Sequence, residues 1–230
     1  MKVDNWLAAL GRALLPPRCL ICREQGTNGL DFCGNCFDCL PWNRSACERC
    51  ALPLPMPGCC GACLRRPPPL EATCAVFLYG NPVDRLLPRL KFHRDLAAGR
   101  LLAELMIPML GTRPRPLALV PVPLHRERLR QRGYDQALEL ARPLARRLDL
   151  PLLPAALRRI RHTAPQSELD ARQRRRNLRA AFQAGAVPLP EHVALVDDVM
   201  TTGQTLHAAA LALRRAGVAR VDAWICARVP

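Results

Sequence analysis

The sequence predicts an α/β fold, a parallel β-sheet flanked by helices, with a small cysteine-rich zinc-binding domain in front of it. Apolar segments without polar alternation, typical of strands buried on both faces, alternate along the chain with segments of helical periodicity. Such alternation indicates parallel strands joined by right-handed crossovers. The zinc-binding domain is predicted because ten of the twelve cysteines lie between Cys19 and Cys63.

Eight of these cysteines form four C-x2-C pairs, and each pair can present two thiolates to one tetrahedral ion. The sequence therefore predicts a double zinc ribbon over residues 19–66 with two structural zinc ions. Because the first two and the last two pairs enclose similar loops, we expect sequential sites with the ligands Cys19, Cys22, Cys33 and Cys36, then Cys47, Cys50, Cys60 and Cys63. A single site and a cross-braced pair are the alternatives. Cys39 and Cys59 adjoin the pairs and are alternative ligands.

A disulfide framework would require an exported protein, and the sequence does not support export. Residues 1–18 are expected to form a short helix, in which Asp4 and Arg12 bracket a short apolar run and no signal-peptide cleavage site follows. No stretch of about 18 apolar residues is available to span a bilayer. We therefore expect a cytoplasmic protein without membrane insertion, whose reduced thiols are available to metal.

Four thiolates around each zinc ion leave no open position for water or substrate. This favours a docking or nucleic-acid-binding role for the ribbons over a catalytic one. The alternative is that zinc does no more than allow the ribbons to fold, since about fifty cysteine-rich residues bury too small a core to fold alone.

A stiff connector, Arg65-Arg66-Pro67-Pro68-Pro69, separates the ribbons from a second domain at residues 70–230, because consecutive prolines disfavour helix and sheet. Half of the 230 residues are hydrophobic, which is enough for a small and a medium-sized domain. In the second domain, apolar runs predict strands at residues 73–79, 117–122, 193–196 and 221–227. Helical patterns predict helices at residues 83–109, 136–148 and 206–215.

The strand at residues 193–196 ends in two carboxylates, Asp197 and Asp198, and a turn of hydroxyls and glycine then opens a helix. Ligands of open α/β sheets bind beyond the carboxyl ends of the strands, where two carboxylates can accept hydrogen bonds from vicinal hydroxyls. Backbone N–H groups at the start of a helix attract anions. An ordinary helix cap is the alternative. The layout favours a phosphorylated sugar, ribose 5-phosphate, held by the acidic pair and by Thr201, Thr202, Gly203, Gln204 and Thr205.

Arginines gather in two stretches of this basic chain, whose formal net charge is +15. The first stretch, which includes Pro123-Leu124-His125-Arg126, follows the strand at residues 117–122 and is expected at the same sheet edge as Asp197. The second stretch lies at residues 158–179. A diphosphate would find positive charge at this edge, whereas the alternative for any single arginine is an ordinary solvated surface.

The thirteen residues 193–205 resemble the phosphoribosyl diphosphate (PRPP) signature of type I phosphoribosyltransferases, in which hydrophobic residues precede Asp-Asp and Thr-Thr-Gly-x-Thr. With the cysteine pairs, three further motifs make nearly the whole chain similar to the ComF family. They are Arg132-Gly133-Tyr134-Asp135-Gln136, Thr163-Ala164-Pro165-Gln166 and Arg174-x-x-Asn177-x-x-x-x-Phe182. Tyr134 and Asp135 depart from the usual Phe-Asn, and the aspartate adds a negative charge and removes a hydrogen-bond donor.

The resemblance implies a type I phosphoribosyltransferase-like domain that binds PRPP together with Mg²⁺. It implies that Asp197 and Asp198 hold the ribose hydroxyls, that residues 201–205 hold the 5-phosphate, and that residues 123–126 form a pyrophosphate loop. It also implies a mobile loop around residues 163–177, and contacts to the ligand from Arg132, Gly133, Gln136, Thr163, Gln166, Arg174 and Asn177. Lys91 stands where family members commonly show Leu-Lys-Phe, and it either reaches the active edge or caps its helix.

Three functions stay open at this point. The resemblance implies a competence protein that handles incoming single-stranded DNA during transformation, alongside other proteins of the competence machinery. The alternatives are a phosphoribosyltransferase of nucleotide metabolism with an unknown acceptor, and a non-catalytic PRPP sensor coupled to a partner. No residue is identified as catalytic. Aromatic residues make up only 4% of the chain, so DNA contacts would be mainly electrostatic.

Overall fold

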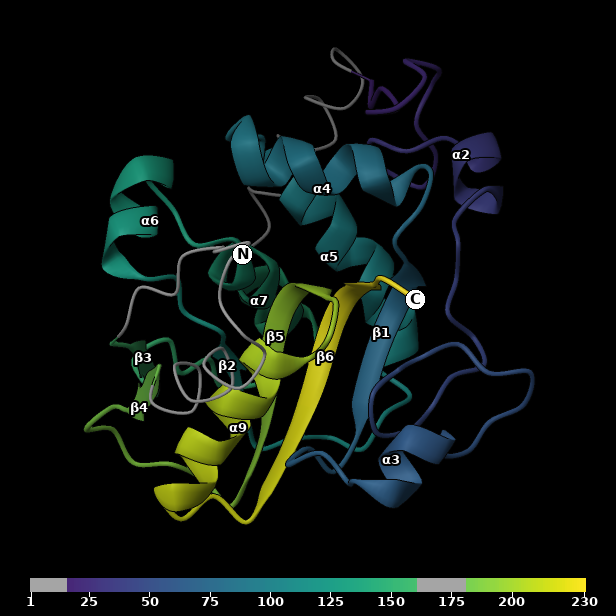
Figure 1. The fold of residues 1–230 in the computed structure, drawn as a ribbon. Helices are drawn as coiled ribbons and strands as arrows, with labels where there is room; N and C mark the ends of the chain where they lie inside the picture. The colour runs from purple at the N-terminus through teal and green to yellow at the C-terminus, as the bar shows by residue number, and fades with distance from the viewer. Residues whose placement is uncertain (1–15, 161–180) are drawn as a thin grey trace, which may run out of the picture.

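The computed structural model describes residues 16–160 and 181–230, and its centre is a four-stranded parallel sheet of order β1-β6-β5-β2 (Figure 1). The strands are β1 (Thr73–Leu78), β2 (Ala118–Pro121), β5 (His192–Met200) and β6 (Arg220–Arg228). The four strands predicted from apolar runs are the four strands of this sheet. The predicted α/β class with a parallel sheet is therefore confirmed.

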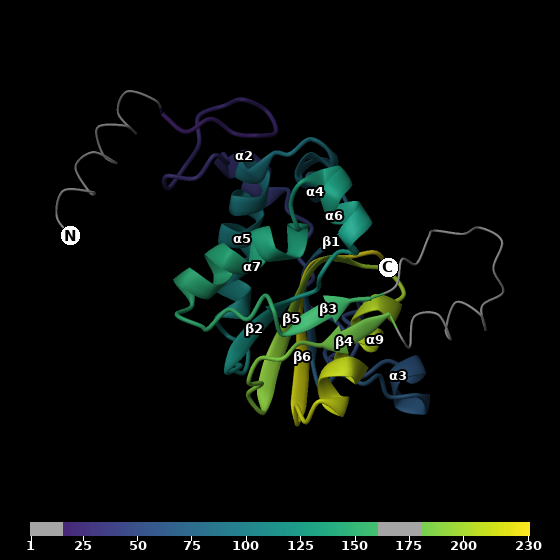
Figure 2. The same ribbon diagram turned by 90° about the vertical axis from the view of Figure 1, so that its left-hand side faces the viewer.

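Helices cover both faces of the sheet (Figure 2). One face packs against α4 (Val83–Phe92), α5 (Leu96–Leu110) and α7 (Gln136–Arg147), and the other against α9 (Gln204–Arg215). Along β5, residues 193–196 enter the two cores alternately, as the two-residue period of a strand requires. An unbroken apolar run is therefore what a strand buried on both faces needs.

Strand β5 is longer than the predicted strand, because it continues through Asp197 and Asp198 to Met200. The reason is that β6 runs on to Arg228 beside it and offers partners as far as the pair Met200 and Arg228. Both carboxylates thus project from a hydrogen-bonded strand and not from a loop. This fixes their backbone positions more firmly than the predicted turn would.

The segment at residues 83–109 is largely helical, as predicted, but it forms two helices, α4 and α5, with a short break between them. Arg94 has a φ of 55° and interrupts the helical backbone. Asp95 then caps α5 by accepting a hydrogen bond from the N–H of Ala98 at 3.1 Å, and it accepts a second from Arg89 Nε at 2.8 Å. A break this short leaves the helical periodicity on each side intact.

Two short antiparallel strands, β3 (Leu157–Arg159) and β4 (Phe182–Ala184), were not predicted. Each has only three residues, which is too short for a two-residue periodicity to be recognised. They flank residues 161–180, which lie outside the described ranges. Together with α9 they lie on the same side of the sheet (Figure 2).

The two ribbons lie at opposite ends of β1, with α2 (Gly34–Asp38) in the first and α3 (Gly61–Arg65) in the second (Figure 1). The chain between them runs antiparallel along the free edge of β1. Leu78 N–H donates to the carbonyl of Pro41 at 2.7 Å, and Thr73 N–H donates to the carbonyl of Glu48 at 2.7 Å. The ribbons therefore cover an edge of the sheet that would otherwise be exposed.

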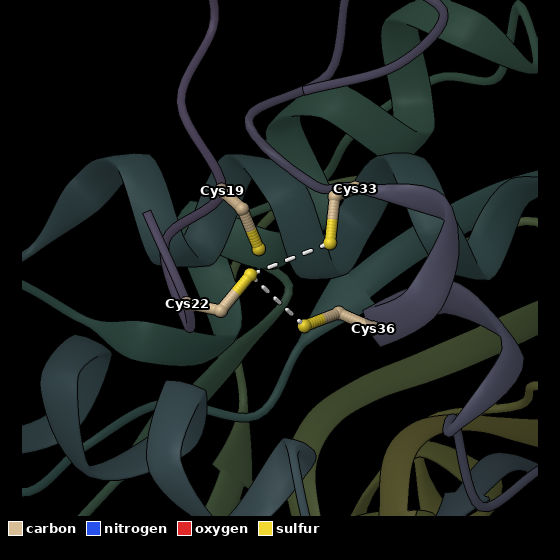
Figure 3. Close-up of side chains that lie close together, drawn as sticks. All are labelled: Cys19, Cys22, Cys33 and Cys36. Atoms are coloured by element: carbon tan, nitrogen blue, oxygen red, sulfur yellow. Dashed lines mark hydrogen bonds between the residues drawn. The ribbon is translucent and has the colours of Figure 1, made fainter. Parts of the chain in front are cut away.

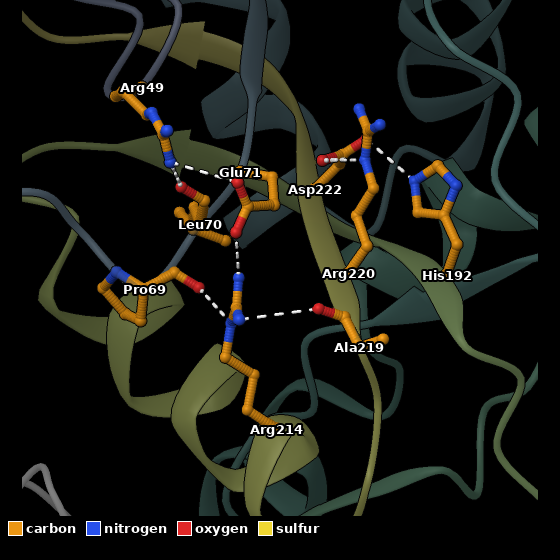
Figure 4. Close-up of polar contacts among 9 residues, drawn as sticks. All are labelled: Arg49, Pro69, Leu70, Glu71, His192, Arg214, Ala219, Arg220 and Asp222. Carbon is orange, nitrogen blue, oxygen red and sulfur yellow. Dashed lines mark hydrogen bonds and ion pairs between the residues drawn. The ribbon is translucent and has the colours of Figure 1, made fainter.

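The connector between the second ribbon and the sheet is held by ion pairs (Figure 4). Glu71 pairs with Arg214 of α9, and with Arg49 of the second ribbon at 3.3 Å. Arg214 Nε also donates to the carbonyl of Pro69 at 2.9 Å. The boundaries of the N-terminal helix, the ribbons and the second domain stay predictions, and residues 1–15 of that helix lie outside the described ranges. Among the residues described, no helix is long and apolar enough to cross a membrane.

Candidate functional site

An open pocket of about 410 Å³ lies at the carboxyl edge of the sheet. It is lined by the end of β5, the loop after β2, and parts of α4, α6 (Arg126–Arg132), α7 and β3. The predicted site residues that line it are Pro123, Leu124, Arg132, Gln136, Asp197, Asp198, Thr201 and Thr205. Ligands of open α/β sheets bind at this edge.

The acidic pair lies at the floor of the pocket and is held from two sides. Asp198 is almost fully buried, and its Oδ2 lies 2.8 Å from Lys91 Nζ of α4. Asp197 Oδ1 accepts a hydrogen bond from the N–H of Asp198 at 2.9 Å. Burial raises the pKa of Asp197 well above its ordinary value, the charge of Asp198 adds to this rise, and Lys91 opposes it. Asp197 therefore binds a proton more readily than an ordinary aspartate does, and Lys91 offsets part of this effect.

The turn after β5 leads into α9 through Gly203, which has a φ of 76°. A Cβ atom at this position would lie 2.6 Å from Met200 Cε, the movable end of a side chain, so glycine is required mainly by its left-handed conformation. No side chain caps α9, whereas Asp95 and Asp135 cap α5 and α7. The first N–H groups of α9 are thus left to an external acceptor or to water, an arrangement suited to an anion. Thr202 is exposed, and Thr202, Gly203 and Gln204 do not line the pocket itself.

Asp135 fixes the loop at residues 123–126 by accepting two backbone hydrogen bonds. Its Oδ2 accepts from Leu124 N–H at 2.8 Å, and its Oδ1 accepts from Leu138 N–H at 3.2 Å. Burial and the charge of Asp198 raise the pKa of Asp135. The carboxylate in place of the usual amide therefore serves as a double acceptor between the loop and α7. Neither of these hydrogen bonds needs the side-chain N–H donor that an asparagine at position 135 would have provided.

The positive charge in the pocket comes from Arg128, Arg132 and Arg159, together with Lys91. His125 and Arg126 do not line the pocket, because His125 is the N-cap of α6 and Arg126 begins that helix. Two and six residues further along α6, Arg128 and Arg132 line the pocket instead. Gly133 ends α6 in the left-handed conformation, with a φ of 82°, and also lies outside the lining.

Gln136 provides a buried hydrogen-bond donor at the pocket wall. Its Oε1 accepts from Arg132 Nη1 at 2.7 Å, and the side chain is only 2% exposed. Its Nε2 has no partner among the residues described. A buried amide donor without a partner carries a free-energy cost that a ligand oxygen would remove. The remaining predicted ligand contacts, Thr163, Gln166, Arg174 and Asn177, lie outside the described residues.

The eight predicted zinc ligands form two clusters of four, and in each cluster the ligand atoms all lie within 4.8 Å of one another. Cys19, Cys22, Cys33 and Cys36 converge in the first ribbon (Figure 3). Cys47, Cys50, Cys60 and Cys63 converge in the second. A tetrahedral ion with Zn–S bonds of about 2.3 Å needs sulfur atoms about 3.8 Å apart. The separations of 3.4 Å between Cys22 and Cys33 and 3.7 Å between Cys50 and Cys60 fit this requirement.

In each cluster one thiol has a lowered pKa, whereas burial raises the pKa of Cys36, Cys50 and Cys63 in the absence of a metal ion. Burial acts to raise the pKa of Cys19, but backbone N–H groups of Cys22 and Cys33 outweigh it and lower this pKa to about 6. In the second cluster, N–H groups likewise outweigh burial and lower the pKa of Cys47 to about 6. All twelve cysteines are described and unpaired by disulfides, and Cys39 and Cys59 belong to neither cluster. The two four-cysteine clusters are thus consistent with two zinc ions.

Comparison with known proteins gives two domain matches, a double zinc ribbon domain over residues 10–64 and a phosphoribosyl transferase domain over residues 135–230. Competence protein F of Haemophilus influenzae is 36% identical over 220 residues, which cover 91% of this chain and 90% of that protein. The chain belongs to the ComF family. The DNA utilization protein YhgH of Salmonella typhi is 35% identical over 222 residues, 93% of this chain and 98% of that protein. The YhgH protein of Escherichia coli K12 is 35% identical over 226 residues.

Lys91, which was expected either at the active edge or as a helix cap, lines the pocket of this ComF protein. The predicted site residues did not include four other charged or aromatic residues that line it: Phe92, Arg128, Asp135 and Arg159. For Arg128, a signal was available, because it is one turn before Arg132 in a segment of helical spacing. Arg159 lies in the unpredicted strand β3, so its position could not be derived. The composition also sets Lys91 apart, because the chain has only two lysines among its 34 lysine and arginine residues.

Proposed function

We propose that this ComF protein binds PRPP with Mg²⁺ in the pocket at the carboxyl edge of the sheet, and that it uses this site in handling incoming DNA. The observation that carries the proposal is the acidic pair on β5 next to the uncapped N-terminus of α9. Vicinal ribose hydroxyls would donate to Asp197 and Asp198, and the 5-phosphate would accept from the first N–H groups of α9. A ribose 5-phosphate presents both groups.

The other side of the pocket supports a diphosphate. Arg128, Arg132 and Arg159 supply positive charge there, and Gln136 Nε2 supplies a buried donor. A bound Mg²⁺ ion would neutralise part of the diphosphate charge, in keeping with its preference for phosphate oxygens and few protein ligands. The residues of the chain would orient the ribose, hold the diphosphate and exclude water from the anomeric carbon.

The role in DNA handling is supported by the relatives, whose names refer to competence and DNA utilization. Single-stranded DNA is the nucleic acid that we propose, because a chain of net charge +15 suits backbone phosphates. Exposed aromatic side chains for base stacking are few, so the contact would be electrostatic. We propose a cytoplasmic location, in which twelve free cysteines stay reduced and the clusters keep their zinc.

Two alternative functions use the same pocket. A phosphoribosyltransferase would join an acceptor nitrogen to the anomeric carbon as the bond to the diphosphate breaks and the acceptor loses its proton. A PRPP sensor would bind the ligand without turnover and transmit its presence to a partner. The retained acidic pair and the intact turn favour binding in all three cases.

Calorimetric titration of the zinc-loaded protein with PRPP and Mg²⁺ tests the proposed site. We expect Asp197→Asn and Asp198→Asn to weaken binding at least about tenfold, since each removes a charged acceptor of ribose hydroxyls. Asp149→Asn is the matched control, because Asp149 is exposed and far from the pocket lining. Equal affinity of the parent and both site variants would refute the site.

Two further assays separate the functions. Release of pyrophosphate with a panel of bases and amines would favour a transferase, whereas binding without release would favour the sensor or the DNA-handling role. Affinity for single-stranded DNA that falls steeply with salt would support DNA handling. Salt-independent or undetectable DNA binding would contradict it.

A further inference from the structure

Lys91 is an exception in the composition of this chain. Of its 34 lysine and arginine residues, only Lys2 and Lys91 are lysines. Lys2 lies outside the described residues. The one lysine that the structure describes contacts the acidic pair in the pocket, at 2.8 Å from Asp198 Oδ2. A chain that uses arginine almost everywhere else thus has an ammonium group at this position.

Contacts of the two residues that precede Lys91 fix the position of α4 at this point. Just before Lys91, the carbonyl of Leu90 accepts a hydrogen bond from the Tyr134 hydroxyl. One residue further back, Arg89 donates to the carbonyl of Leu20 in the first ribbon and pairs with Asp95. The Lys91 side chain is 25% exposed and that of Asp198 is 10% exposed, so the pair is shielded but open to the pocket.

An ammonium group differs from a guanidinium group in ways that matter at this site. Lysine is a compact point charge, whereas arginine presents a planar fork that binds both oxygens of a carboxylate. Lys91 Nζ contacts Oδ2 of Asp198. A guanidinium group in its place would occupy both oxygens, while the ammonium leaves the second oxygen to other donors.

We propose that Lys91 is a positioning residue of the phosphoribosyl site, which orients Asp198 and keeps the acidic pair negatively charged so that it can accept hydrogen bonds from ribose hydroxyls. This proposal rests on the proposed function of the pocket. Lys91 acts on the ligand through the two carboxylates and takes no part in bond making or breaking.

The charges around the acidic pair support this role. Asp135 at the start of α7 adds negative charge, and burial together with the charge of Asp198 raises the pKa of Cys226 of β6. The positive groups that act on these residues are Lys91 of α4 and Arg159 of β3. Burial lowers the pKa of Arg159, and Lys91 contacts Asp198 directly.

The test is calorimetric titration with PRPP and Mg²⁺ between about pH 5.5 and about pH 8.5. The variants are Lys91→Met, which removes the charge at similar length, and Lys91→Arg, which keeps it. Arg85→Met is the matched control, since Arg85 is an exposed residue of the same helix. Ionisation of the ligand phosphate is common to all four proteins and cancels in the comparison.

We expect Lys91→Met to bind about tenfold more weakly near neutral pH and to approach the affinity of the parent at the alkaline end. Lys91 lowers the pKa of Asp197, so without the ammonium Asp197 loses its proton only at higher pH, and the acid limb of the affinity profile moves up by about one pH unit. Lys91→Arg should bind more weakly than the parent, but its affinity profile should have the same pH midpoint. Arg85→Met should match the parent at every pH. A uniform loss at every pH, or no loss, in Lys91→Met would overturn the proposal.

A second measurement uses the rarity of lysine. Protein labelled with ¹³C-lysine gives only two sets of lysine side-chain signals, and Lys91→Arg assigns them. We expect the Lys91 signal to follow the ionisation of Asp197 in the free protein and to shift when PRPP binds. If the parent binds PRPP but this signal neither titrates nor shifts, the inference fails and the proposed function stands. If the parent does not bind PRPP, both fail.

Discussion

Asp135 accepts backbone hydrogen bonds from Leu124 and Leu138, and so it joins the loop after β2 to the start of α7. An asparagine there could accept only through its single amide oxygen. In this chain the carboxylate serves both acceptor roles, at the cost of a negative charge beside Asp198. The residues around the pocket thus combine a rigid backbone with an accumulation of charge that is unfavourable for folding.

Gly203→Ala should damage both the turn and the phosphate site. Its left-handed φ of 76° costs an alanine about 1 kcal/mol, and the new Cβ would approach Met200 Cε to 2.6 Å. We expect a lower free energy of unfolding in urea and weaker binding of ribose 5-phosphate. Gly80→Ala is the control, because a Cβ there meets nothing within 4 Å. Parent-like binding by Gly203→Ala would contradict the role of this turn.

Asp197→Asn should stabilise the protein at neutral pH although it weakens ligand binding. Burial and the charge of Asp198 raise the pKa of Asp197 in the folded state, so the ionised carboxylate opposes folding above its unfolded pKa. We expect a gain of roughly 1 kcal/mol near pH 7. Below about pH 4 the carboxyl is neutral in both states and the gain should vanish. Urea unfolding of the parent and the variant at the two pH values measures this gain. A variant less stable than the parent at pH 7 would show that the charge of Asp197 stabilises the folded protein.

At the scale of elements, α4 connects the first zinc cluster to the pocket. Arg89 donates to the carbonyl of Leu20, between the ligands Cys19 and Cys22, and Lys91 lies two residues further along the helix. The first ribbon also contributes Cys19, Phe32 and Cys33 to the core that contains α4. The folded structure of the first ribbon therefore helps to determine the position of Lys91 in the pocket.

Cys22→Ser should loosen α4. Loss of one of four thiolates weakens zinc binding, and the contacts of Arg89 and the ribbon core then lose their support. We expect faster amide hydrogen exchange in α4, with little change in α9 on the opposite face of the sheet. Cys39→Ser is the matched control, an exposed cysteine of the same ribbon outside the cluster. The same exchange rates in α4 of the Cys22 variant and the parent would disprove the link.

The strands and the ligand clusters could be predicted because their signals are local. Residues 193–196 form an unbroken apolar run, and the cysteines pair at a spacing that few other structures use. Residues 93–95, which separate α4 from α5, give no comparable sequence signal for a break in the helical segment. The break depends on Asp95 finding the N–H of Ala98 and the side chain of Arg89, a choice that only the folded chain decides.

The pocket could be predicted only in part, for a similar reason. The acidic pair and the turn are contiguous in sequence, so their chemistry is visible there. Lys91, Arg128 and Arg159 come from three elements that meet only after folding. Arg126 was expected to face a diphosphate, but it starts α6, and helical geometry directs Arg128 and Arg132 toward the pocket.

At the scale of the molecule, the two ribbons lie at opposite ends of β1, and the second is tied to the sheet by Glu71. This residue pairs with Arg214 of α9 and Arg49 of the ribbon (Figure 4). At the same end of the sheet, Asp222 accepts from His192 and Arg220. The connector is therefore fixed by its polar contacts, and it does not behave as a free spacer.

Glu71→Gln should lower stability slightly at neutral pH. The hydrogen bond and charge of Arg214 lower the pKa of Glu71, so its contribution is present above the unfolded pKa and is lost as the pH falls through the folded pKa. Because the side chain is 40% exposed, we expect less than about 1 kcal/mol, reduced further by salt. Glu24→Gln, at an exposed position, is the control. Thermal unfolding at neutral and acid pH tests this, and an effect that grows on acidification would contradict the ion pair.

A crystal structure of the zinc-loaded protein with PRPP and Mg²⁺ would test the central claim most directly. We predict ribose hydroxyls within hydrogen-bond distance of Asp197 and Asp198, the 5-phosphate at the N–H groups that follow Gly203, and the diphosphate beside Arg132 and Gln136. A ligand bound outside this pocket, or one whose ribose does not contact the acidic pair, would contradict the account.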